Sequence, residues 1–301
     1  MTHTKRLIQL VILLGASLLV VVALRAAQSG PPEGTAYAGA DACATCHEEK
    51  AMALKETPHG QKGFDMRSEH GCETCHGAGT AHVDGEGDTS KIVQFGTMST
   101  TEASAVCLQC HENGPQTNWV GSVHESRDVG CIDCHSIHSA KSQNSQLKTA
   151  KIEDTCNRCH SAIKGQLMRT SHHPIREGLV TCDDCHNPHG SNTPKLISAE
   201  TVNDKCYECH TEKRGPYLWD HPPVRENCLS CHTPHGSNHP KLTVAKRPWL
   251  CQRCHADTRH PGTLYDAQGV DTSDRVFDRS CSNCHLTLHG SNHPSGKTFL
   301  R

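Results

Sequence analysis

The sequence contains 301 residues, of which 35% are hydrophobic and 4% aromatic, with 20 Cys and 25 His. An ordinary soluble domain is ~45–50% apolar with Gly included, so this chain lacks the side chains for the core of a two- or three-domain globular enzyme. The 30 Lys and Arg nearly balance the 32 Asp and Glu, which argues against a nucleic-acid-binding protein and against a disordered one. Something other than side chains must therefore fill the interior.

The N-terminus carries an apolar segment over residues 7–24, directly after Lys5 and Arg6. Basic residues before such a run are typical of an export signal. The run is long for a signal-peptide core and short for a membrane span of ~20 residues, so cleavage and retention as an inner-membrane anchor both stay open. We assign residues 1–38 to a signal peptide or N-terminal membrane anchor and residues 39–301 to one exported domain.

All 20 cysteines fall into ten Cys-x-x-Cys pairs, and a His follows every pair directly. On a short helix, positions i, i+3 and i+4 share one face, so two thiols and an imidazole project together. This is the c-type haem attachment motif, in which the thiols bond the vinyl groups and the His binds the iron. Zinc ribbons and disulfide scaffolds also use Cys pairs, but neither requires a His after each pair.

The motifs therefore predict ten covalently bound c-type haems. The predicted thioether residues are Cys43, Cys46, Cys72, Cys75, Cys107, Cys110, Cys131, Cys134, Cys156, Cys159, Cys182, Cys185, Cys206, Cys209, Cys228, Cys231, Cys251, Cys254, Cys281 and Cys284. The predicted proximal iron ligands are His47, His76, His111, His135, His160, His186, His210, His232, His255 and His285.

Fifteen histidines lie outside the motifs, and one of them recurs after each motif. This cadence divides the exported domain into five dihaem repeats at about residues 43–82, 107–138, 156–189, 206–235 and 251–289. Ten spare ligands for ten irons would give bis-His coordination throughout. The predicted distal ligands are His59, His82, His124, His138, His173, His189, His221, His235, His260 and His289.

Sequence separation limits which haem each distal His can serve. His138, His189 and His235 lie three residues after a proximal His, about one helical turn, so they cannot pass to the other face of the same haem and must bind a different one. A second group lies 11–13 residues after a proximal His and is expected to reach the opposite face of that haem or of the next. This group comprises His59, His124, His173 and His221.

Two of these assignments involve a choice between histidines. We prefer His173 over its neighbour His172, because Pro174 follows it as Pro222 follows His221. His293 is the reserve for His260 as the last distal ligand.

The other spare histidines are expected to be structural or free. His239 and His293 occupy a Ser-Asn-His-Pro repeat in which another copy has Thr193. His70 is expected to be free, and His3 precedes the apolar segment. The five Met residues have no regular placement, so Met ligation is not expected.

The fold class expected is a multihaem cytochrome c, mostly irregular with short α-helices, five dihaem repeats in an elongated haem wire and little or no β structure. Short helices should cover the attachment motifs, for example residues 101–111 and 154–168. Pro-His-Gly sequences should form tight turns that aim a distal His. The aromatic residues expected to pack on the macrocycles are Trp119, Trp219, Trp249, Tyr217 and Tyr265.

The sequence resembles the periplasmic decahaem c-type cytochromes of the MtrA/DmsE/PioA family. The resemblance spans residues 40–301 and rests on the ten motifs, Cys185-His-Asn-Pro-His-Gly190, Glu212-Lys-Arg-Gly-Pro216 with Leu218-Trp219, and His289-Gly-Ser-Asn-His-Pro-Ser-Gly-Lys297. It implies a bis-His haem chain inside an outer-membrane β-barrel porin. It further implies electron exchange between periplasmic or inner-membrane cytochromes and an extracellular multihaem cytochrome, terminal reductase or insoluble acceptor.

Electron transfer is expected rather than catalysis, because bis-His ligation leaves no open iron position for a substrate. One alternative is a soluble periplasmic shuttle or electron-storage cytochrome. A second is a multihaem oxidoreductase, which needs at least one five-coordinate haem; the fifth repeat, with its irregular spacing, is the candidate for such a site. Thioether haem attachment places the domain on the periplasmic side in each case.

Overall fold

The computed structural model describes residues 36–61, 70–142, 145–255 and 280–300. The predicted export segment, His260 and Tyr265 lie outside these residues. Within the described ranges, no helix has the length and apolar character needed to cross a membrane.

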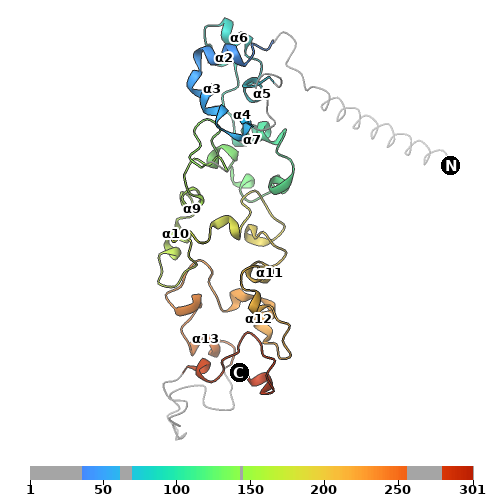
Figure 1. Cartoon of the computed structure of the whole chain (residues 1–301), viewed down its shortest axis with the longest axis vertical. Helices are drawn as coiled ribbons and strands as arrows, with labels where there is room; N and C mark the ends of the chain where they lie inside the picture. The colour runs from blue at the N-terminus through green and yellow to red at the C-terminus, as the bar shows by residue number, and fades with distance from the viewer. Residues whose placement is uncertain (1–35, 62–69, 143–144, 256–279, 301) are drawn as a thin grey trace, which may run out of the picture. The chain divides into compact units, whose positions relative to one another are not determined.

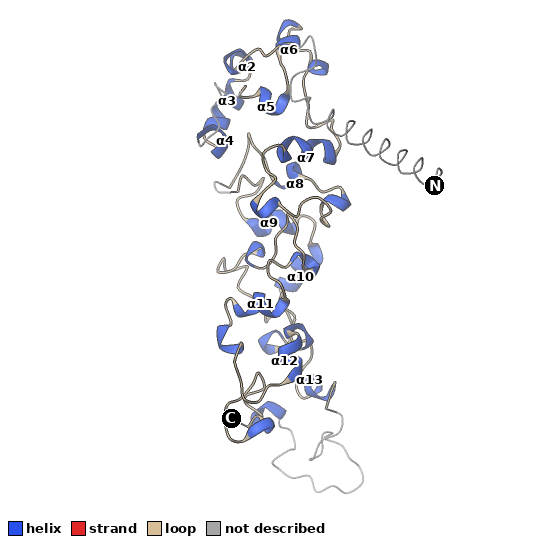
Figure 2. Cartoon of the chain, turned by 90° about the vertical axis from the view of Figure 1, so that its right-hand side faces the viewer, coloured by secondary structure: helices blue, strands red, loops and turns tan. Residues whose placement is uncertain are grey.

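Short α-helices joined by loops make up the chain (Figures 1 and 2). Among the described residues the longest helix, α7, has nine residues. The α-helices are α2 (Ala40–Cys46), α3 (Glu48–Lys55), α4 (Pro58–Gln61), α5 (Glu73–His76), α6 (Thr80–Asp84), α7 (Thr100–Leu108), α8 (Cys131–Cys134), α9 (Ile152–Asn157), α10 (Ser161–Leu167), α11 (Val202–Tyr207), α12 (Pro222–Glu226) and α13 (Trp249–Gln252).

Single 3₁₀ turns lie between these helices. They are η1 (Thr89–Lys91), η2 (Gly114–Gln116), η3 (Glu125–Arg127), η4 (Cys182–Asp184), η5 (Pro194–Leu196), η6 (Thr211–Lys213), η7 (Cys228–Ser230), η8 (Pro240–Leu242), η9 (Cys281–Asn283) and η10 (Gly296–Thr298).

The attachment motifs wind into one helical turn. In nine of them the backbone N–H of the His donates to the carbonyl of the first Cys, at 2.9–3.1 Å, as in His47 to Cys43 and His232 to Cys228. This i to i+4 bond brings both thiols and the imidazole to one side of the turn. The prediction of short helices at the motifs is confirmed.

The expected helix boundaries differ in detail. The helix expected over residues 101–111 is α7 (Thr100–Leu108). The helix expected over residues 154–168 is two helices, α9 and α10, and His160 between them has ψ 53°. A proximal His at the end of its turn leaves the helical path, so the chain starts a new helix with Ser161.

The described residues contain no extended strand, in agreement with the expected fold class, but they contain isolated antiparallel bridges. Three bridges close the loop that follows an attachment motif: His135 with Leu147, His186 with Ile197 and His232 with Thr243. Two others join distant segments, Ser171 with Ser237 and Trp219 with Ser291. The bridges were not predicted, because each involves one residue pair and leaves no alternating pattern in the sequence.

The chain forms two compact units. The first comprises the described residues up to Cys107 together with Ser136–Gln146, and the second comprises Leu108–His135 and the described residues from Leu147 onward. In the first unit the carboxylate of Glu73, only 3% exposed, accepts N–H bonds from Ala38, Gly39 and Gly79 at 2.7–2.9 Å. Glu73 thereby ties the chain before the first motif to the second motif.

The polypeptide buries few apolar side chains, as its composition predicts. Among the described residues the buried hydrophobic side chains are Ala51, Leu54, Ala103, Trp119, Leu147, Leu167 and Ile175. Large apolar side chains such as Val120, Leu179 and Leu218 are at least 72% exposed. The protein chain alone therefore does not supply the interior that a domain of this size needs.

Candidate haem sites

Eight pairs of His rings lie at almost the same separation. Their centroids are 6.0–6.4 Å apart, and every pair joins the His of one Cys-x-x-Cys-His motif to one predicted distal ligand. The pairs are His47–His82, His76–His138, His160–His124, His135–His189, His210–His173, His186–His235, His255–His221 and His232–His289.

This separation fits a metal between two imidazoles. A ligating nitrogen lies about 2.0 Å from a transition metal and about 1.15 Å from its ring centre, so two opposed rings on one metal are about 6.3 Å apart. Directly stacked rings lie much closer, as Tyr37 and His70 do at 3.8 Å. The ring pairs therefore leave room for one iron each.

Backbone carbonyls fix the orientation of many of these rings. Nδ1 of the proximal His76, His186, His232 and His285 lies 2.5–2.9 Å from the carbonyls of Val93, Lys195, Lys241 and Thr298. A carbonyl oxygen only accepts hydrogen bonds, so Nδ1 carries the proton. Nε2 is then the nitrogen available to a metal, and the carbonyl bond increases its basicity.

Distal rings are held in the same way. The Nδ1 atoms of His82, His124 and His173 lie 2.6–2.9 Å from the carbonyls of Asp88, Pro188 and Pro234.

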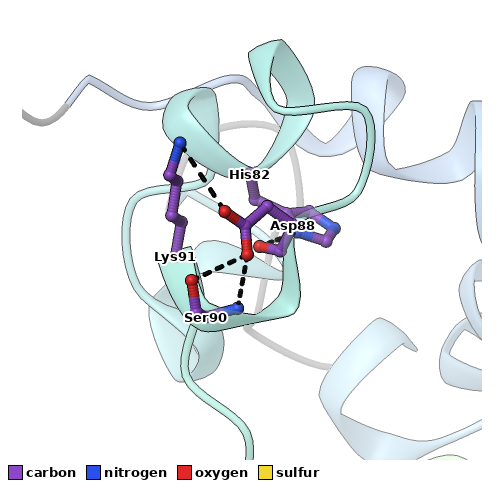
Figure 3. A network of polar contacts seen from close by, with 4 residues as sticks. All are labelled: His82, Asp88, Ser90 and Lys91. Carbon is purple, nitrogen blue, oxygen red and sulfur yellow. Dashed lines mark hydrogen bonds and ion pairs between the residues drawn. The ribbon is translucent and has the colours of Figure 1, made fainter.

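Around His82 the carbonyl belongs to a small polar network (Figure 3). The Asp88 carboxylate accepts bonds from the N–H and Oγ of Ser90 at 3.0 and 2.7 Å, and Lys91 Nζ lies 3.7 Å away. The Ser90 bonds hold the pKa of Asp88 below its usual value. Together these contacts stabilise the turn that presents the Asp88 carbonyl to His82.

Burial favours the metal-binding form of five predicted distal rings. Desolvation is the main cause that lowers the pKa of His138, His189, His221, His235 and His289. A lower pKa favours the neutral imidazole, which is the metal-binding form.

Cysteines of successive motifs lie beside each other. Hydrogen-bonding thiol pairs form between the first Cys of two motifs in Cys43/Cys72, Cys156/Cys182, Cys206/Cys228 and Cys251/Cys281. The first attachment points of two neighbouring haems are therefore adjacent.

Comparison with known proteins agrees with this geometry. The family model described as "Doubled CXXCH motif" matches residues 172–215 and 221–260. The model described as "Cytochrome c-type protein NrfB-like" matches residues 72–152. The multiheme cytochrome MtrA of Shewanella baltica (strain OS185) is 42% identical over 279 residues, which cover 87% of this chain and 81% of that protein. The chain belongs to the MtrA family of multihaem cytochromes.

Membership of this family confirms the predicted resemblance and supports covalently bound c-type haem as the cofactor. All 20 cysteines are described and none forms a disulfide. In the described part of the chain, no group of three or more His, Cys, Asp or Glu side chains could hold a metal such as zinc.

In this multihaem cytochrome the neighbours His172 and His173 have different surroundings. The His173 ring lies 6.3 Å from His210. In His172, Nδ1 lies 2.7 Å from the Arg169 carbonyl and Nε2 lies 3.2 Å from Glu177. Both nitrogens of His172 are thus engaged by protein atoms, whereas His173 stands opposite a proximal ring.

The remaining spare histidines have local contacts. His293 Nδ1 accepts a bond from the N–H of Ser295 at 3.1 Å, the backbone N–H of His239 donates to Ser237 Oγ at 2.9 Å, and His70 stacks on Tyr37. His260 lies outside the described residues. His59 lies in α4, and the ring pairs above include neither it nor His111.

One expectation about sequence separation is wrong. His124, His173 and His221 do not stand opposite their own motif's His or the next one; each faces the motif after the next, at His160, His210 and His255. The intervening motif belongs to a second series, which takes its distal partner from further along the chain, as His135 does from His189. Two interleaved series account for the skipped motif, and separation along the chain alone did not reveal them.

The sequence analysis also missed the loops that supply the proximal carbonyls. Lys195 and Leu196 have φ of 63° and 60°, and Lys241 and Leu242 have φ of 59° and 55°. Two consecutive left-handed residues without Gly are costly. The available signal was the repeated Pro-Lys-Leu at 194–196 and 240–242, since in both copies the Lys lies nine residues after a proximal His, which indicates a shared local role.

Proposed function

We propose that this protein is a periplasm-facing decahaem cytochrome that conducts electrons along a chain of bis-His haems. The observation that carries the proposal is the set of eight His ring pairs, each made from one motif His and one predicted distal His at 6.0–6.4 Å. Each bound haem supplies reversible one-electron chemistry at its iron.

The chain's own residues hold and insulate these groups. Two thiols of each motif would anchor a macrocycle, a motif His and a distal His would bind its iron, and the backbone carbonyls fix these imidazoles in one orientation. With both axial positions closed, no iron is open to a substrate, which favours electron transfer over catalysis. His59 and His260 stay predicted distal ligands, and His111 and His285 stay predicted proximal ligands, from the sequence pattern alone.

The adjacent first cysteines of the paired motifs support the division into dihaem repeats. The two interleaved ligand series support close spacing, because a distal ligand for one haem lies within a few residues of the attachment site of another. Close spacing from one repeat to the next is what a conducting chain requires.

We further propose that the chain works inside an outer-membrane β-barrel porin. The relative with 42% identity is a multiheme cytochrome, and the polar surface of this chain needs a shield from lipid if it is to carry electrons across a bilayer. Periplasmic or inner-membrane cytochromes would exchange electrons at one end, and an extracellular multihaem cytochrome or terminal reductase at the other.

The test places the protein, together with its co-purified porin, in liposomes that contain a reduced dye. External ferric substrate should oxidise the enclosed dye in the presence of the complex and not in liposomes with porin alone. A protein that purifies only as a soluble monomer, or a verified complex that leaves the dye reduced, would overturn the conduit and favour a soluble shuttle.

A further inference from the structure

Three turns of similar sequence each present a distal His. They are Pro188-His189-Gly190, Pro234-His235-Gly236 and Leu288-His289-Gly290, which we call the His-Gly turns. Their His rings lie 6.0–6.2 Å from the proximal rings of His135, His186 and His232. The His side chain of each turn therefore belongs to a single ring pair.

The residue before the His makes a second connection. The Pro188 carbonyl lies 2.7 Å from Nδ1 of His124, and the Pro234 carbonyl lies 2.6 Å from Nδ1 of His173. These two rings belong to other ring pairs, because His124 stands opposite His160 and His173 stands opposite His210. Two consecutive residues of one turn thus contact the axial ligands of two different sites.

The Gly after the His allows the turn to reach that second ligand. A Cβ on Gly190 would lie 2.0 Å from the Asn118 carbonyl oxygen, and one on Gly236 would lie 2.0 Å from the Gln166 carbonyl oxygen. On Gly290 it would lie 2.1 Å from the Tyr217 ring. Asn118, Gln166 and Tyr217 each lie a few residues before another distal His. Any side chain at the three Gly positions would therefore push the turn away from that segment.

Further bonds hold the turn at 234–236 against its segment. Ser171 and Ser237 exchange two backbone hydrogen bonds, at 3.0 and 2.7 Å. The guanidinium of Arg169 donates to the Gly236 carbonyl at 3.2 Å. The turn is therefore fixed on both sides of the point where the Pro234 carbonyl meets His173.

We propose that the His-Gly turns at residues 188–190 and 234–236 are positioning elements for two haem sites each: the His binds one iron, and the backbone orients the distal His of a second. The inference rests on the proposed bis-His ligation. It assigns a role to Pro188, Gly190, Pro234 and Gly236 that the ligand pattern alone does not give. Displacing one turn should disturb two haems of different series together, since the carbonyl sets both the orientation and the basicity of the second imidazole.

The test compares three variants of the holoprotein by the number of ferrous irons that bind CO. His235→Ala removes one distal ligand and keeps the Pro234 carbonyl, so one additional iron should bind CO. Gly236→Ala pushes the turn off its segment, so two additional irons should bind CO, those of the motifs ending at His186 and His210. Gly165→Ala is the control, because a Cβ at Gly165 in α10 meets nothing within 4 Å, and no iron should open.

A Gly236→Ala protein that opens one iron or none would overturn the proposal. If that variant does not accumulate, Arg169→Gln is the second test, because it weakens the bond that holds the Gly236 carbonyl and removes no iron ligand. The midpoint potentials of two haems should then shift together in a spectroscopically monitored titration, and a shift of one haem or none would refute the inference. Failure of the proposed ligation would look different, because the unmodified protein would already bind CO at several irons.

Discussion

At the scale of single residues, hydrogen bonds to backbone carbonyls orient many of the predicted axial histidines. A carbonyl on Nδ1 leaves Nε2 for the metal and needs no additional side chain. This explains how a chain that is only 35% hydrophobic can fix so many ligands, because each turn of backbone supplies its own acceptor. It also means that a His and its immediate neighbour can have different roles.

The neighbours His172 and His173 give a direct test. His173→Ala should open one iron of the ten predicted, because this ring stands 6.3 Å from His210. His172→Ala should open none, because its ring contacts Arg169 and Glu177. CO binding to the reduced protein distinguishes the two. The opposite result would move the ligand assignment to His172.

Glu73 should matter for stability in the first compact unit. Glu73→Ala leaves three N–H groups without their buried carboxylate acceptor, and the loss should be about 3 kcal/mol, since bonds to a charged group contribute more than neutral ones. The exposed Glu56→Ala is the matched control and should change the free energy of unfolding by less than about 0.5 kcal/mol. Urea denaturation followed by haem absorbance measures both. Equal midpoints would show that the Glu73 contacts do not stabilise the fold.

The sequence predicted residue types well and ring partners poorly. Cys43 to Cys284 and the motif histidines follow from a strict local spacing, which fixes the chemistry of each motif. The partner of His124 is His160, and the loops between them decide this pairing. No local spacing encodes it, so it needed the three-dimensional structure.

At the scale of elements, the Pro-Lys-Leu turns adopt a strained left-handed backbone that orients the proximal His. Lys241, with φ 59°, sends its carbonyl to Nδ1 of His232 at 2.9 Å, and the Leu242 carbonyl accepts the N–H of Thr233 at 2.7 Å. A right-handed conformation at these positions would turn both carbonyls away. The strain is therefore tied to the proximal ligand.

Substitutions at Lys241 should separate strain from orientation. Lys241→Gly keeps the left-handed conformation at less cost, so it should stabilise the protein by about 1 kcal/mol and leave the midpoint potential of that haem unchanged. Lys241→Pro forces φ to about −65° and turns the residue 241 carbonyl away from His232 Nδ1, so the midpoint potential should rise because the imidazole becomes a weaker electron donor to the iron. Denaturation and potentiometric titration test the two effects. Identical potentials in both variants would contradict the link.

The elements were predictable in kind and less so in extent. The single turn at each motif follows from its spacing, and it is present at nine motifs as a bond from the His N–H to the first Cys. The break at His160 is a local feature, with ψ 53° at that residue, whereas the bridges Ser171–Ser237 and Trp219–Ser291 depend on contacts between remote segments. Local sequence propensity does not predict such contacts.

At the scale of the whole molecule, the shortage of buried apolar side chains and the ten motifs describe the same property. If haem fills the interior, every motif must carry one. Mass spectrometry of the mature protein should therefore give the polypeptide plus ten haems, and the double variant Cys182→Ala/Cys185→Ala should give nine. A mature protein with fewer than ten would show that some motifs are not used, and the fifth repeat would then be examined first.

A conduit and a storage protein differ in how they respond to one altered haem. His173→Ala changes the potential of a single site in the second compact unit, and for a one-electron couple each shift of about 59 mV changes the equilibrium with a neighbour about tenfold. In a conduit, electrons must pass that site, so dye oxidation across the liposome membrane should slow by at least about tenfold. The number of electrons accepted in solution should fall by at most one, because the other sites still fill, and His172→Ala should change neither quantity. An unchanged transmembrane rate in a verified complex would mean that this haem lies off the path, and storage would then explain the ligand arrangement better than conduction.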